Sequence, residues 1–157
     1  MRKTDFELAN WISKKDRFNG FATVRFKQAR QFDGGSLVWI TRDIVEETCV
    51  AIRDRVFKRL KRKFSWVTTI ENGNGEKRMH VHMAIAVPND ISFDEFEMVF
   101  LEVCGRMEWV HKRVDLRSVV DSDQDEDIRK VIFYMFKEGG DAFAVNASSL
   151  IGLSAGR

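Results

Sequence analysis

The stretch from Met79 to Val87, MHVHMAIAV, constrains the fold more than any other part of the chain. Successive side chains of a β-strand point to opposite faces, so a strand here places His80 and His82 together on one face. The larger apolar side chains alternate with them, and we expect that second face to be buried. Only alanines follow the histidines on their own face. They leave room there, which some other part of the protein must fill.

A second predicted strand, residues 65–71, is joined to the histidine strand by the turn-rich segment NGNGEKR, which indicates an antiparallel hairpin. If Glu71 lies opposite His80, then Thr69 lies opposite His82, and opposite residues point the same way. Two imidazoles and a carboxylate suit a divalent ion such as Mn²⁺ or Zn²⁺, or Mg²⁺ where the ion also holds a phosphate. The alternative is that the histidines are ordinary half-buried strand residues.

Periodicity predicts the other elements in the order strand, helix, hairpin, helix, strand, helix. Outside the hairpin, the predicted strands are residues 20–29 and 109–119, and the predicted helices are residues 43–63, 92–107 and 126–138. We expect one domain over residues 1–140. Residues 141–157 are expected to form a flexible tail or the start of a further segment.

Charge and cysteine usage narrow the classes of protein. Residues 51–63 carry seven basic side chains and one acid within a chain of net charge +2, which suits a phosphate backbone or, equally, a solvated helix face. Cys49 and Cys104 lie in predicted helices, which suggests free thiols in a reducing compartment. No stretch is apolar enough for a signal peptide or a membrane span. We therefore expect a cytoplasmic protein with no membrane partner.

The last predicted helix carries the only tyrosine of the chain, Tyr134, beside thirteen phenylalanines. Helical spacing places Tyr134 with Lys130 and Lys137, away from an apolar stripe that must face the core: Ile128, Val131, Ile132 and Met135. The phenol oxygen is therefore a candidate nucleophile, and a nearby cation or metal would activate it. The alternative is a surface tyrosine that packs its ring and forms a hydrogen bond.

Together these motifs resemble those of the HUH endonuclease superfamily. His80-Val81-His82 resembles its histidine-hydrophobic-histidine signature, and YMFK at 134–137 resembles its nucleophile motif, a tyrosine followed three residues later by a lysine. Residues 70–88 are similar to rolling-circle replication initiators, in which a strand ending in Glu leads by a short turn into the histidine strand. FATVRF at 21–26 would be their first, structural motif, although it lacks the usual Thr-Leu-Thr-like core beyond Thr23.

The resemblance spans about residues 20–140 and implies an α+β fold. This would be a ferredoxin-like or RRM-like antiparallel sheet of four or five strands with helices packed on it and the catalytic tyrosine on the last helix. It also implies that Glu71, His80 and His82 bind a divalent metal ion, Mn²⁺ or Mg²⁺, which polarises a DNA phosphate for attack by Tyr134. The products would be a 5′-phosphotyrosine link and a free 3′-hydroxyl, with Lys137 keeping the surroundings of the phosphate positive.

The implied partner is single-stranded DNA, in particular the hairpin of a plasmid or phage origin in a bacterial host, with a host helicase or polymerase acting on the product. We expect a monomer or a transient dimer, and DNA contacts from Arg25, Lys27, Arg78 and Lys130. His111 is expected to contact DNA or solvent rather than the metal. Two alternatives stay open. One is a small insertion-sequence transposase of the same superfamily, and the other is a non-catalytic nucleic-acid-binding module of ferredoxin-like fold.

Overall fold

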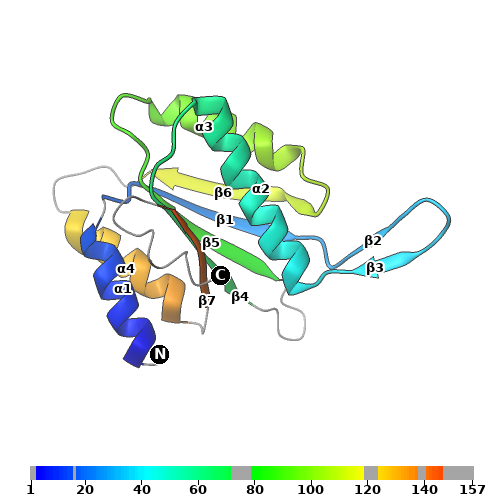
Figure 1. Ribbon diagram of the computed structural model, residues 1–157, viewed down its shortest axis with the longest axis horizontal. Coiled ribbons are helices and arrows are strands. Elements are labelled where there is room, and N and C mark those ends of the chain that lie inside the picture. Colours follow the sequence, from blue (N-terminus) through cyan, green and yellow to red (C-terminus); the bar gives the residue numbers. More distant parts are fainter. Residues whose placement is uncertain (1–2, 16, 72–78, 119–123, 138–140, 147–157) are drawn as a thin grey trace.

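The computed structural model describes residues 3–15, 17–71, 79–118, 124–137 and 141–146. In this part of the chain, five strands form one antiparallel sheet in the spatial order β6-β1-β5-β4-β7, and two short strands form a separate hairpin (Figure 1). The sheet strands are β1 (Gly20–Phe26), β4 (Trp66–Glu71), β5 (His80–Ile85), β6 (Val110–Ser118) and β7 (Asp141–Asn146). The helices are α1 (Lys3–Lys15), α2 (Arg42–Leu60), α3 (Phe93–Gly105) and α4 (Gln124–Lys137). The predicted α+β class, an antiparallel sheet with helices packed on it, is confirmed.

The larger of two apolar cores lies between the sheet and the helices α2 and α3. From β5 it receives Val81, Met83 and Ile85, which are fully buried. The two helices contribute a stripe of buried side chains at helical spacing: Val45, Cys49, Ile52, Val56, Phe96, Phe100 and Cys104. The alternation of MHVHMAIAV therefore predicted the buried face of this strand correctly.

A smaller core lies on the other face of the sheet, under α1 and α4. Ala84 is fully buried there against a cluster of helix side chains that includes Ile12, Ile132, Met135 and Phe136. The room beside Ala84 and Ala86, which follow the histidines on this face, is thus filled by the two helices. The same packing holds α4 across the face that carries the histidines.

Capping residues mark both ends of α2 and the beginning of α3. The Thr41 hydroxyl accepts a hydrogen bond from the backbone N of Ile44, so α2 begins at Arg42, one residue before the predicted start. Lys61 ends α2 in the left-handed conformation, with φ of 59°. The Ser92 hydroxyl caps α3 by accepting a hydrogen bond from the backbone N of Glu95.

Four elements were not predicted from the sequence. The helix α1 precedes the first strand, and the strand β7 pairs with β4, so the sheet runs past residue 140, the predicted end of the domain. The first strand ends at Phe26 rather than at residue 29, because the chain turns there into a separate hairpin of β2 (Ala29–Gln31) and β3 (Leu37–Trp39). Figure 1 shows this hairpin projecting from the body of the protein.

Candidate active site

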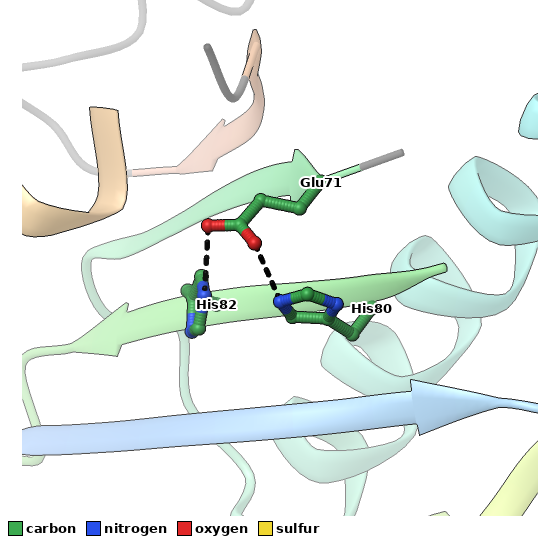
Figure 2. Close-up of side chains that lie close together, drawn as sticks. All are labelled: Glu71, His80 and His82. Atoms are coloured by element: carbon green, nitrogen blue, oxygen red, sulfur yellow. Dashed lines mark hydrogen bonds and ion pairs between the residues drawn. The ribbon is translucent and has the colours of Figure 1, made fainter. Parts of the chain in front are cut away.

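The hairpin β4–β5 has the predicted register, with Glu71 opposite His80 and Thr69 opposite His82. As a result, the Glu71 carboxylate reaches both imidazoles (Figure 2). Its Oε2 lies 2.6 Å from Nε2 of His80, and its Oε1 lies 3.2 Å from Nε2 of His82. The three side chains are mostly shielded, with exposed fractions of 13%, 22% and 12% for Glu71, His80 and His82.

The other ring nitrogen of His82 also has a partner. Thr23 of β1 lies opposite His82, and its hydroxyl oxygen is 3.1 Å from Nδ1 of the imidazole. His82 is therefore held from both sides, by Glu71 on β4 and by Thr23 on β1. Contacts of this kind fix the orientation and tautomer of a histidine that binds a metal.

The surroundings of His82 favour the neutral imidazole. Burial lowers the pKa of His82 below its ordinary value, and the charges of His80 and Arg25 act in the same direction, against the opposing effect of Glu71. A histidine must be neutral to donate its lone pair to a metal ion. The shielded position on the middle strand therefore suits a ligand.

The donor set fits a divalent cation. One ligand atom from each of Glu71, His80 and His82 can be chosen so that all lie within 4.8 Å of one another. Ligand atoms that bind one ion at about 2.1 Å are about 3–3.5 Å apart from one another. Small side-chain rotations would therefore bring the three ligand atoms close enough to share one ion. Two imidazoles and one carboxylate leave coordination positions for substrate oxygens, which is the pattern of a catalytic rather than a closed structural site.

Tyr134 lies directly beside this group. Its ring packs edge-on against the His82 ring, with 5.7 Å between the ring centroids, and 53% of the residue is exposed. The neighbouring Ile132, Met135 and Phe136 are buried, and they anchor α4 on the sheet. The helix thus presents the phenol at a cavity of about 610 Å³ that His80 and His82 also line.

The predicted DNA-contacting residues are distributed unevenly around this cavity. Arg25 lines it and forms an ion pair with Asp115 of β6 at 2.8 Å. Lys130 is exposed on α4, one turn before Tyr134, whereas Lys27 is half-buried beyond the end of β1 and is not among the lining residues. Arg78 lies outside the described residues. Lys137 ends α4, and its side chain also lies outside what the structure describes.

His111 is placed away from the three-residue group. It lies on β6, where its Nδ1 accepts a hydrogen bond of 3.3 Å from the backbone N of Arg113. Two further residues of the cavity, Thr23 as a partner of His82 and Asp115 as a partner of Arg25, were not identified from the sequence. Both depend on strand pairings between distant segments, which no local pattern indicates.

Comparison with known proteins gave no sequence relative: no family model matches the chain, and no curated protein matches it. Three solved structures match part of its backbone, with low sequence identity and low TM-scores. The hypothetical protein ORF119 from Sulfolobus islandicus rod-shaped virus 1 has 15% identity and a TM-score of 0.47, over 87% of this chain and 96% of that chain.

The second is a REP-associated tyrosine transposase bound to a REP hairpin, with 16% identity and a TM-score of 0.38, over 75% of this chain and 64% of that chain. The third is the N-terminal nuclease domain of minute virus of mice non-structural protein 1, described with Zn²⁺ coordination in its active site pocket. It has 11% identity and a TM-score of 0.36, over 90% of this chain and 73% of that chain. None of the helices in the described residues combines the length and apolarity needed to cross a bilayer.

Proposed function

We propose that this protein is a metal-dependent endonuclease of the HUH type, which nicks and rejoins single-stranded DNA through a 5′-phosphotyrosine intermediate. The observation that carries the proposal is the position of Tyr134 against His82, at the cavity lined by His80 and His82. A candidate nucleophile and a candidate metal site, widely separated in sequence, meet at one exposed surface. The proposed biological role is to initiate rolling-circle replication of a plasmid or phage in a bacterial host.

Glu71, His80 and His82 would hold the divalent ion, for which Mn²⁺ and Mg²⁺ are the proposed choices. When bound, such an ion polarises a scissile phosphate and offsets the negative charge that develops on its oxygens. The three ligands come from two hydrogen-bonded strands, so their backbones are held rigidly. Thr23 keeps the His82 ring turned toward Glu71.

Tyr134 is the proposed nucleophile. Its phenol oxygen forms a bond to phosphorus as the bond from phosphorus to the 3′ oxygen breaks. The phenol gives up its proton, and the departing oxygen takes up a proton to become a 3′-hydroxyl. Because 53% of Tyr134 is exposed, the residue is accessible from solvent to a DNA strand. Lys130 and Lys137, on the same helix, are proposed to keep the surroundings of the phosphate positive.

The proposed substrate is a single strand next to an origin hairpin, because a nucleophile beside the metal site needs an unpaired, accessible phosphate. Arg25 is the basic side chain of the cavity that directly neighbours the metal ligands, since it lies opposite His80 in the sheet. It can contact the strand once its ion pair with Asp115 gives way. That pair is partly exposed, so its disruption costs little.

The test is a labelled single-stranded oligonucleotide carrying the origin hairpin, incubated with the protein and Mn²⁺. We expect a protein–DNA adduct that survives denaturation, together with a product that has a free 3′-hydroxyl. The matched control is Tyr134→Phe, which removes one oxygen atom and leaves the ring contact with His82. An adduct formed by Tyr134→Phe, or cleavage by the parent protein with no adduct, would overturn the proposed mechanism.

A further inference from the structure

A second groove lies between α2 and α3, on the face of the sheet opposite the candidate active site. It has a volume of about 550 Å³ and is lined mainly by basic side chains: Arg55, Lys58, Arg59 and Arg106, with Val103 at its base. The helices α2 and α3 belong to the larger apolar core, whereas α4 and its tyrosine cover the other face. The two concave surfaces are therefore separated by the thickness of the sheet.

The sequence places these charges together through helix geometry. On α2, residues 55, 58 and 59 are spaced by three and four, so they lie on one side of the helix. Arg106 follows directly after the last residue of α3 and completes the lining of the groove. The two helices run antiparallel there, because Arg59 contacts Glu102 while Arg55 contacts Met107.

Two acids beside this groove are paired with arginines. Glu102 accepts a hydrogen bond of 2.9 Å from Arg59, and Asp90 pairs with Arg62 beyond the end of α2. Glu108 pairs with Arg30 at 2.9 Å, and it lines, together with Glu47, a neighbouring hollow to which Arg55 and Arg106 also contribute. Among the ion pairs of the described residues, none joins a carboxylate to Arg55, Lys58 or Arg106. The groove therefore carries an excess of positive charge.

The candidate active site carries no such excess. Among the described residues that line its cavity, Arg25 and Arg117 are balanced by Asp115 and Glu97, and Glu71 adds a negative charge beside the histidines. Without a bound ion, that face attracts a polyanion weakly. A substrate as highly charged as DNA would be attracted more strongly to the basic groove on the opposite face of the sheet.

We propose that the groove between α2 and α3 is a second DNA-binding surface, which holds the phosphate backbone of duplex DNA and does so without a metal ion. This inference rests on the proposed function, since it assigns to the same protein the paired stem that flanks a nicked single strand. Guanidinium groups donate paired hydrogen bonds to phosphate oxygens, and three of the four basic residues of the groove are arginines. None of the described residues that line the groove is aromatic, so these residues offer phosphate contacts rather than stacking of unpaired bases.

The test compares Lys58→Gln/Arg106→Gln with a control that removes the same charge elsewhere, Lys14→Gln/Lys112→Gln. Lys58, Arg106, Lys14 and Lys112 are all exposed, and neither change removes an ion pair that holds α2 to α3. Binding of a blunt-ended duplex is measured by anisotropy in EDTA over a range of salt concentrations. Each lost phosphate contact lowers the slope of log affinity against log salt by about 0.9.

For the groove variant we expect duplex binding about tenfold weaker at low salt, with a slope smaller by about 1.8, while the control behaves like the parent. An equal slope for the groove variant and the parent would overturn the inference. So would displacement of the duplex by polyglutamate of matched charge as effectively as by unlabelled duplex, because the groove would then suit an acidic protein.

Single-strand cleavage separates this inference from the proposed function. With Mn²⁺ and a saturating short single strand that has no paired stem, Lys58→Gln/Arg106→Gln should cleave at the parent rate. A large loss of cleavage under these conditions would contradict a separate duplex surface. If instead Tyr134→Phe forms adducts, the proposed nicking mechanism is wrong. The duplex-binding measurement in EDTA still tests the proposed role of the groove in that case.

Discussion

The two faces of β5 have different roles: one is part of the apolar core, and the other carries the candidate metal ligands. One face inserts Val81, Met83 and Ile85 into the core under α2 and α3, and all three are fully buried. The other presents His80 and His82 to Glu71 at the edge of a cavity, with Ala84 buried further along under α1 and α4. One short strand thus supports the fold on one side and a candidate site on the other. Substitutions on the two faces should therefore affect different properties.

The largest effect is expected on the histidine face. His80→Ala removes one of three proposed ligands, and we expect it to abolish Mn²⁺ binding and DNA cleavage. Its thermal midpoint should stay close to that of the parent, because His80 is partly exposed and fills no core. Calorimetric titration with Mn²⁺ measures the first property and circular dichroism the second. Parent-like affinity for Mn²⁺ in His80→Ala would show that the ligands are misassigned.

The matching change on the apolar face is Ile85→Ala. Ile85 has no exposed surface and belongs to the larger core, so its truncation should lower the free energy of unfolding by about 2–5 kcal/mol. Below the unfolding transition, Mn²⁺ affinity should be unchanged. Chemical denaturation measures the free energy of unfolding, and calorimetric titration measures the Mn²⁺ affinity. A Mn²⁺ affinity that falls together with stability would mean that the two faces are not separable.

A smaller effect is expected from the hydroxyl that holds His82. Thr23→Val keeps the shape of the side chain but removes the hydrogen-bond partner of Nδ1 of His82. Loss of such a partner lowers metal affinity by about 10–100-fold, and we expect a decrease of this size in Mn²⁺ affinity. Thr23→Ser keeps the hydroxyl and should retain most of the affinity. Equal affinities for the Val and Ser variants would show that the hydroxyl does not position the imidazole.

The smallest effect concerns charge at the cavity. The hydrogen bond from Arg25 holds the pKa of Asp115 below its ordinary value, so Asp115 is anionic at neutral pH and neutralises Arg25. Asp115→Asn should free Arg25 and tighten single-strand binding a few-fold at low salt, with little change at high salt. Anisotropy at two salt concentrations measures this. Weaker binding by Asp115→Asn would mean that Asp115 orients Arg25 rather than competing with DNA for it.

Local sequence patterns were sufficient to predict the parts of the site that lie within one hairpin or one helix. The cluster of Glu71, His80 and His82 followed from one hairpin, because a short connection and strict alternation determine both register and face. Tyr134 could be separated from the apolar stripe of its helix by spacing alone, and Ile132 and Met135 are indeed buried while Tyr134 is exposed.

Contacts between distant segments could not be predicted in this way. Thr23 and Asp115 reach the cavity only because β1 pairs with both β5 and β6, and no local pattern selects those partners. The strand β7 lies beyond residue 140, where the domain was predicted to end, and it forms because β4 offers an edge with which it can pair. The helix α1 was missed although Ala9 and Ile12 have helical spacing, because its apolar stripe is short and surrounded by charged residues.

If the Glu71, His80 and His82 group and Tyr134 form one nicking site, the covalent bond to DNA must form at Tyr134 and depend on the histidines. The protein is incubated with Mn²⁺ and a single-stranded origin oligonucleotide and digested with a protease and a nuclease, and its peptides are analysed by mass spectrometry. We expect one modified peptide, with a nucleotide 5′-phosphate on Tyr134, present in the parent and absent from His80→Ala. A nucleotide attached to another residue, or an adduct of equal yield in His80→Ala, would contradict the proposed nicking site.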